Sequence, residues 1–125
     1  MSQGVPGIPQ VSFETDTYQV LLLRVGPKAS ELDPATVKRL QGEHVAYLFE
    51  LQSSGKLLAA GAVATRSSAQ PITGIGYFNL GSVDEVERLV SRDPSVAAGL
   101  ESAEVMTFIC PKGHFSFPHS EVQSD

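Results

Sequence analysis

The sequence has a single cysteine, no excess of positive charge and no long hydrophobic run. Because Cys110 is the only cysteine in 125 residues, no disulfide can form within the chain, and packing must stabilise the fold. Nine Lys and Arg against 14 Asp and Glu give a formal charge of −5, which argues against binding to nucleic acid or to an anionic membrane. The longest apolar stretch, residues 57–64, is far shorter than the roughly 20 residues of a membrane-spanning helix.

The composition fits one globular domain. Hydrophobic residues make up 42% of the chain and charged residues 18%, which is enough to bury one core. The ends are polar and rich in Gly and Pro, so we expect a flexible N-terminal arm at 1–16, a domain at 17–112 and a flexible C-terminal tail at 113–125. Residues 1–10 lack a basic cluster followed by an apolar core, so we expect a cytoplasmic protein.

Short apolar stretches bounded by Gly or Pro predict four strands. They lie at 18–25, 56–64, 72–80 and 104–110. The capping box formed by Ser82 and Glu85 predicts a helix that ends before Pro94, and a short turn or helix follows.

A long helix is predicted between the first two strands. Its start is the dipeptide Asp33-Pro34, in which the carboxylate accepts from free backbone amides and proline occupies the first helical position, and it runs to about Ser54. At 100° per residue, one face of this helix is apolar, with His44 in its middle. The residues that share this face are Val37, Leu40, His44, Leu48 and Leu51.

The element order β-α-β-β-α-β predicts the α+β class, as a ferredoxin-like sandwich with a four-stranded antiparallel sheet and two helices on one face. The strands are apolar on both sides, so the second face of the sheet also needs a cover. We expect a second copy to supply it, giving a homodimer in which two sheets close into a dimeric α/β barrel. In the alternative, the terminal arms lie across the sheet.

Several stretches together resemble the YCII-related domain family. They are His44 on the first helix, LQSSGKLLAAG at 51–61, SVDEV at 82–86, Asp93-Pro94 and AGL at 98–100, and the resemblance covers about residues 18–112. It implies the ferredoxin-like fold, the dimeric barrel and a cleft between helices and sheet. It also implies an acid/base pair that maps onto His44 and Asp93. Most members of the family have no assigned reaction, and a few resemble aromatic-degradation enzymes, including dehydrochlorinases.

His44 and Asp93 each have a structural interpretation beside the catalytic one. By its position alone, His44 fits a core histidine that satisfies a buried acceptor, because an unpaired buried polar group costs about 1 to 3 kcal/mol. Asp93 precedes Pro94 and suits the cap of the following turn, a role compatible with pairing to histidine. Cys110, His114 and His119 have a spacing that zinc could use, but they lie on a Gly- and Pro-rich tail. We expect no metal and no cofactor.

Two functions follow from these residues. The first is a cofactor-independent enzyme of lyase, isomerase or dehydrochlorinase type, in which His44 moves a proton on a small apolar or aromatic molecule and Asp93 orients it. The second is a non-catalytic ligand-binding or assembly domain with a structural buried histidine. A third hypothesis, a haem or oxygen-using enzyme, depends only on analogy with other proteins of this fold.

Overall fold

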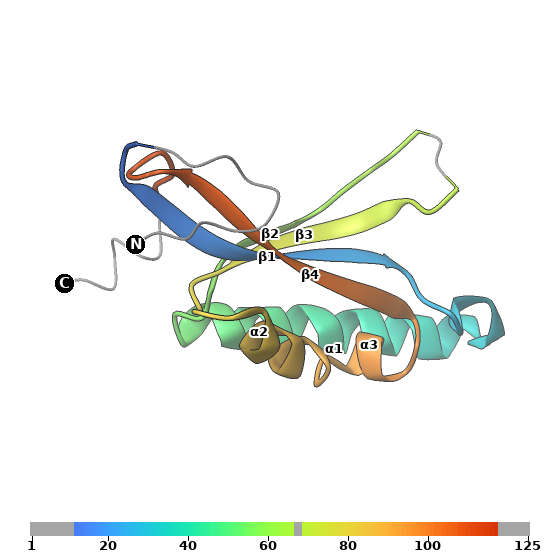
Figure 1. Cartoon of the computed structure of the whole chain (residues 1–125). Coiled ribbons are helices and arrows are strands. Elements are labelled where there is room, and N and C mark those ends of the chain that lie inside the picture. Colours follow the sequence, from blue (N-terminus) through green and yellow to red (C-terminus); the bar gives the residue numbers. More distant parts are fainter. Residues whose placement is uncertain (1–11, 67–68, 118–125) are drawn as a thin grey trace.

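The structure, a computed structural model, describes residues 12–66 and 69–117. It consists of one sheet and one layer of helices beneath it (Figure 1). The elements in order are β1 (Thr15–Val25), the 3-10 helix η1 (Ala29–Glu31), α1 (Pro34–Ser53), β2 (Leu57–Ala62), β3 (Ile72–Phe78), α2 (Val83–Val90), α3 (Pro94–Ala97) and β4 (Glu101–Pro111).

The sheet has the strand order β2-β3-β1-β4, and every neighbouring pair is antiparallel. The first and last strands are therefore neighbours, and the β2–β3 hairpin adds to the other side of β1. All three α-helices lie on one face of the sheet (Figure 1). The predicted α+β ferredoxin-like sandwich is confirmed.

The helix starts follow the predicted capping chemistry. At α1, the Asp33 carboxylate accepts a hydrogen bond from the Thr36 amide at 2.7 Å, and Pro34 is the first helical residue. At α2, the Ser82 hydroxyl accepts from the Glu85 amide at 3.2 Å. Local sequence thus determines where both helices begin.

The core lies between the helical layer and the inner face of the sheet, the face that α1 and α2 cover. Alternate residues of β1 point into it, as the pleat requires. Each large side chain buried here contributes about 2 kcal/mol. The buried cluster is Leu21, Leu23, Leu51, Leu57, Phe78, Val86 and Val90.

Two strands are longer than the apolar pattern predicts. β1 begins at Thr15 and β4 at Glu101, each three residues earlier than expected. They pair along their whole length, from Thr15 opposite Pro111 to Val25 opposite Glu101. Backbone hydrogen bonds between neighbours therefore set these bounds, rather than local hydrophobicity.

The ends of the chain differ in part from the expected arms. Thr15 and Asp16, within the predicted arm at 1–16, belong to β1. Residues 113–117 of the predicted tail lie against the sheet, as the ring contacts below show. The rest of both predicted arms, residues 1–11 and 118–125, lies outside the described residues.

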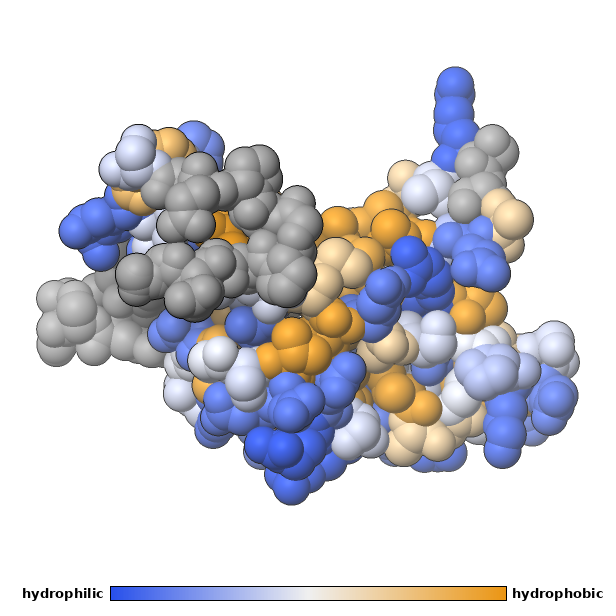
Figure 2. Space-filling view, in the orientation of Figure 1, coloured by the Kyte–Doolittle hydropathy of each residue, from blue (hydrophilic) through white to orange (hydrophobic). Residues whose placement is uncertain are grey.

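The outer face of the sheet, which the helices do not cover, carries an aromatic cluster. Phe117 packs edge-on against Tyr18 with ring centroids 5.4 Å apart, and Phe115 lies 6.1 Å from Tyr77 and 5.9 Å from Phe108. In these contacts, residues of the predicted C-terminal tail cover part of the outer face, as in the alternative in which the terminal arms lie across the sheet. Hydrophobic surface is also visible over β2 and β3 (Figure 2). Within the described residues, no helix combines the length and hydropathy needed to cross a membrane.

Candidate active site

The helical layer brings His44 and Asp93 into contact. Nδ1 of His44, in the middle of α1, lies 2.5 Å from Oδ2 of Asp93, at the start of α3. The other carboxylate oxygen of Asp93 accepts from the Ser95 amide at 2.9 Å and so caps α3. One carboxylate therefore both caps a short helix and binds the imidazole, and the two interpretations of Asp93 are compatible in the structure.

This pair is removed from water, and its ionised form is stabilised. The side chain of Asp93 is 4% exposed and that of His44 is 15% exposed. The hydrogen bond to Asp93 raises the pKa of His44 above its ordinary value, although burial opposes the shift. Burial alone would raise the pKa of Asp93, but hydrogen bonds from His44 and Ser95 hold it below its ordinary value. The imidazolium and the carboxylate thus stabilise each other.

The second ring nitrogen of His44 is open. Within the described residues Nε2 forms no hydrogen bond, and no buried side-chain nitrogen or oxygen lacks a partner. Because His44 also lines a pocket, its Nε2 is accessible from that pocket. The arrangement fixes one nitrogen with a carboxylate and leaves the other for a ligand.

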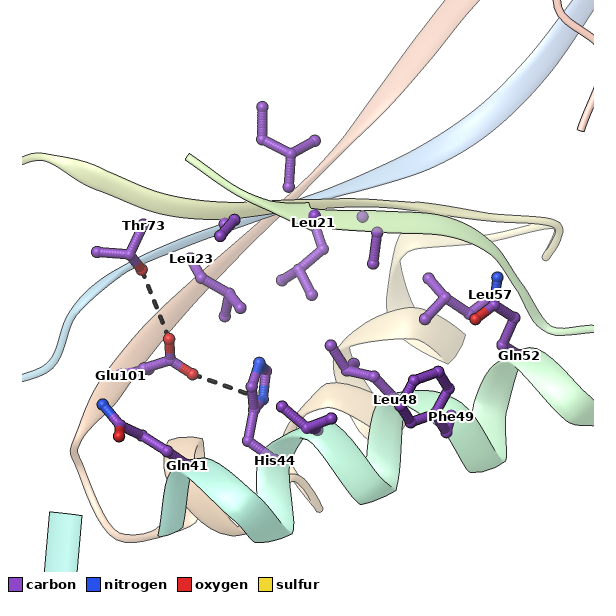
Figure 3. Close-up of a pocket in the computed structure, with 17 residues that line it drawn as sticks. Leu21, Leu23, Gln41, His44, Leu48, Phe49, Gln52, Leu57, Thr73 and Glu101 are labelled. Carbon is purple, nitrogen blue, oxygen red and sulfur yellow. Dashed lines mark hydrogen bonds and ion pairs between the residues drawn. The ribbon is translucent and has the colours of Figure 1, made fainter. Parts of the chain in front are cut away.

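A cavity of about 380 Å³ lies between α1 and the inner face of the sheet. Its walls are mostly apolar, and Gln41, His44, Thr73 and Glu101 gather at one end (Figure 3). Leu48 and Phe49 lie toward the other end (Figure 3). The remaining lining residues are Leu21, Leu23, Val45, Gln52, Leu57, Ala60, Gly61, Ala62, Gly74, Ile75 and Gly76. The end around His44 is the more polar one, and Gln52 adds one amide near Leu57 at the other end (Figure 3). This lining suits a small molecule with an apolar body and a polar group at the His44 end.

Two glycines of β3 leave room for the cavity. A Cβ at Gly74 would lie 3.3 Å from Leu23 Cδ1, and a Cβ at Gly76 would lie 3.4 Å from Leu57 Cδ1. Both residues line the cavity, so side chains there would fill it. The Gly74-Ile-Gly76 sequence therefore permits close approach across the sheet.

Glu101 is the site residue that the sequence reasoning missed. Its Oε1 lies 3.6 Å from Nδ1 of His44 and accepts a hydrogen bond from Ser95 Oγ at 2.7 Å. The apolar pattern predicts that the last strand begins at residue 104, three residues later than observed. It therefore places Glu101 in the loop before the strand and does not predict which way its side chain points. No local sequence signal marks Glu101, because its place in the site follows from the pairing of β4 with the full length of β1.

The candidate zinc ligands lie apart from this site. Cys110 is buried in β4, where burial raises the pKa of its thiol, and His114 is exposed, with its ring 5.6 Å from that of Phe115. His119 falls outside the described residues. In the ranges 12–66 and 69–117, no three His, Cys, Asp or Glu side chains cluster with metal-binding geometry.

The fold and the sequence together place the chain in a family. The family model of the YCII-related domain matches residues 19–109, and the chain belongs to this family.

Ten chains of solved structures are similar to this chain, among them the following two. One is the 5-chloro-2-hydroxyhydroquinone dehydrochlorinase TftG of Burkholderia phenoliruptrix AC1100, in complex with 2,5-dihydroxybenzoquinone, with 22% identity and a TM-score of 0.49 over 78% of this chain and 95% of that one. The other is the protein At3g17210 of Arabidopsis thaliana, with 14% identity and a TM-score of 0.38 over 82% of this chain and 100% of that one. No curated protein matches the sequence.

Proposed function

We propose that the protein is an enzyme in which His44 moves a proton on a small apolar or aromatic molecule and Asp93 orients the imidazole. The observation that carries this proposal is the 2.5 Å contact of His44 Nδ1 with Asp93 beside a cavity of about 380 Å³. The reaction class is a cofactor-independent elimination or isomerisation, of the lyase, isomerase or dehydrochlorinase type. Membership of the YCII-related family is consistent with this proposal.

The proposed mechanism uses the two ring nitrogens differently. In the neutral imidazole, Nδ1 carries the proton and its N–H donates a hydrogen bond to the Asp93 carboxylate, so the lone pair of Nε2 faces the substrate. Nε2 then takes a proton from carbon or oxygen of the substrate, and Asp93 stabilises the imidazolium that forms. In an elimination the electron pair of the broken bond expels a leaving group such as chloride, and in an isomerisation Nε2 returns the proton to another atom.

The surroundings of the pair favour this chemistry. The side chains of His44 and Asp93 are only 15% and 4% exposed, and this low exposure strengthens the electrostatic interaction between the imidazolium and its carboxylate. Asp93 is fixed by its role as the cap of α3, so it orients the imidazole without reorganisation. A general base placed in this way contributes about 10² to 10⁴ in rate.

We also propose that the protein is a homodimer formed through the outer face of the sheet. Met106 is 38% exposed and Phe108 36% exposed there, and residues 113–117 cover only part of the face. By its register, Met106 lies opposite Val20 on the face away from the helices. Apolar side chains gathered on one sheet face favour burial against a second copy.

The catalytic proposal is tested by hydrogen exchange in D₂O. A panel of small phenols, chlorinated hydroquinones and enolisable ketones is incubated with the protein, and NMR follows exchange of carbon-bound hydrogen and release of chloride. His44→Ala should lower the rate on any active compound to near background. His114→Ala is the matched control, because this exposed histidine lies outside the cavity and its loss should leave the rate unchanged.

An alanine variant of His44 that retains the rate would overturn the assignment. If the wild-type protein binds compounds from the panel but exchanges none, the non-catalytic ligand-binding function replaces the catalytic one. In that case Asp93→Asn should alter stability while ligand affinity stays nearly unchanged.

A further inference from the structure

Glu101 carries a carboxylate at the polar end of the cavity, and nothing in the proposed proton transfer uses it. It is the first residue of β4, and its side chain is 18% exposed. The backbone around it is held by Gly26, whose amide donates to Leu100 O at 2.8 Å. A Cβ at Gly26 would lie only 2.3 Å from Gly99 O. The close approach of Gly26 to the backbone just before Glu101 therefore needs glycine at this position.

The carboxylate of Glu101 is held by hydroxyl groups. Its Oε1 accepts from Ser95 Oγ at 2.7 Å, and its Oε2 accepts from Thr73 Oγ1 at a long 3.5 Å. The contact of Oε1 with His44 Nδ1, at 3.6 Å, is too long for a hydrogen bond. Figure 3 shows Glu101 between Thr73 and His44.

Ser95 lies between Asp93 and Glu101 and bonds the two carboxylates with different groups. Ser95 Oγ has one hydrogen, and it lies 2.7 Å from Glu101 Oε1 and 2.9 Å from Asp93 Oδ1. Because Asp93 Oδ1 already accepts from the Ser95 amide, the hydroxyl is better used on Glu101. The imidazole is held by Asp93 at 2.5 Å and does not need Glu101.

Glu101 consequently has spare capacity to accept hydrogen bonds. A carboxylate has about four acceptor positions, and the long contact from Thr73 leaves Oε2 only weakly satisfied. Glu101 lines the cavity, so a ligand donor that enters the polar end reaches this oxygen.

The charges around the cavity also favour a ligand without an anionic group. None of the described lining residues is Lys or Arg. Even with His44 protonated, the carboxylates of Asp93 and Glu101 outnumber its single positive charge. An anionic ligand would meet Glu101 at short range, and among the described lining residues no Lys or Arg would compensate the repulsion.

We propose that Glu101 is a substrate-contacting residue that selects ligands with an O–H or N–H donor and no anionic group. The apolar body of the ligand lies along Leu48 and Phe49, and its donor points to Oε2 of Glu101 near Nε2 of His44. The proposal rests on the proposed function, since it places the donor end of the substrate beside the base. It makes Glu101 a determinant of specificity that is separate from the proton-transfer pair.

Benzamide and benzoate test this selectivity, because they share a ring and a planar polar end but differ in donor and charge. Their dissociation constants are measured by ligand-observed NMR at pH 8 on the wild type and on Glu101→Gln. We expect the wild type to prefer benzamide, and the variant to lower the ratio of affinities at least about tenfold, the size of one charge-assisted hydrogen bond. Glu104→Gln is the matched control, because this residue of the same strand is 54% exposed and pairs with Arg24 outside the cavity.

The proposal is overturned if wild-type protein binds benzoate as tightly as benzamide, if it fails to bind benzamide, or if Glu101→Gln leaves the ratio unchanged. Should Glu101→Gln fail to fold, Glu101→Asp must weaken benzamide binding, since it withdraws the carboxylate by one methylene. Failure here is distinct from failure of the proton-transfer proposal. If Glu101→Gln leaves the ratio of benzamide to benzoate affinity unchanged while His44→Ala abolishes exchange, Glu101 has no role in selectivity and His44 remains the base. If Glu101→Gln shifts the ratio but the wild type shows no exchange, Glu101 selects the ligand and the proton-transfer proposal fails.

Discussion

The two faces of the sheet come from the same strands but carry different chemistry. Beneath the inner face, the polar pairs join His44 of α1 to Asp93 at the start of α3, and Ser95 of α3 to Glu101 of β4. Two glycines of β3 leave a cavity beneath the strands.

On the outer face, Tyr18 of β1 packs edge-on with rings from residues 113–117, and Tyr77 of β3 and Phe108 of β4 pack against these rings at a tilt. The helical layer thus encloses a cavity against the inner face, whereas the outer face carries exposed apolar side chains such as Met106. Changes on one face should therefore leave the property of the other intact.

The largest effect expected on the inner face is the loss of proton transfer. His44→Ala should reduce the rate of exchange or elimination by about 10² to 10⁴, because it removes the general base. Asp93→Asn should cause a smaller loss, since the base remains but its orienting carboxylate does not. Kinetics in D₂O would measure the loss of rate in both variants, and light scattering would measure their molecular mass. A change in molecular mass in either variant would break the separation between the faces.

On the outer face, the expected effect is on assembly. Replacing both Met106 and Phe108 by Glu places two charges where apolar side chains would be buried, so the mass should fall from twice 13.3 kDa to 13.3 kDa. The catalytic rate should stay within about twofold, because a single chain supplies all the described residues of the cavity. A wild-type protein that is already monomeric would refute the homodimer, and a monomeric variant without activity would refute the independence of the two faces.

The pair of His44 and Asp93 should also make stability depend on pH. Because the pKa of His44 is raised above 6.5, its contribution is complete below pH 6.5 and is lost as the pH rises through the raised value. Because the pKa of Asp93 is lowered below 3.8, its contribution is present above pH 3.8 and is lost as the pH falls through the lowered value. The pair therefore stabilises the fold most between about pH 4 and 6.5.

Urea unfolding of wild type and His44→Gln across this range measures the contribution of the pair. The advantage of the wild type in free energy of unfolding should reach about 2 kcal/mol within the window and decline on both sides. A difference that increases steadily above pH 6.5 would have the wrong sign and would contradict the pairing.

The smallest effects separate the cavity from the rest of the fold. Gly76→Ala should weaken benzamide binding several-fold, because its Cβ enters the cavity next to Leu57. Gly42→Ala, on α1 with no atom within 4 Å of the new Cβ, should instead raise the free energy of unfolding by about 0.5 to 1 kcal/mol and leave binding unchanged. Equal effects of both variants on binding would show that helix stability, rather than cavity space, controls the ligand.

The sequence was informative where local chemistry decides the structure. Asp33-Pro34 and the capping box at Ser82 predict the observed helix starts, because a cap needs only residues within one turn. The position of His44 on the apolar face of α1 predicts that it points toward the sheet, as Figure 3 shows. The helix starts follow from capping chemistry and the direction of His44 from helical periodicity, and both are local.

The sequence was less informative where distant segments meet. The contact of His44 with Asp93 joins residues 49 positions apart and was implied only by the resemblance to the family. Glu101 lies in the site because β4 pairs with the whole of β1, which no local apolar pattern indicates. The packing of Phe115 on the outer face likewise depends on where β4 ends. Because the sequence does not show this end, its Gly- and Pro-rich composition predicts only a flexible tail.

The most direct test of the account is the titration of His44 by NMR with ¹⁵N-labelled histidine, assigned with His44→Gln. For His44 we predict a pKa above 6.5, a neutral form protonated at Nδ1, and a pKa that falls in Asp93→Asn. We also predict that benzamide shifts the Nε2 signal, because that nitrogen is open to the cavity. A pKa at or below 6.5, a neutral form protonated at Nε2, or an Nε2 signal that saturating benzamide leaves unchanged would contradict an acid/base pair and favour a structural histidine.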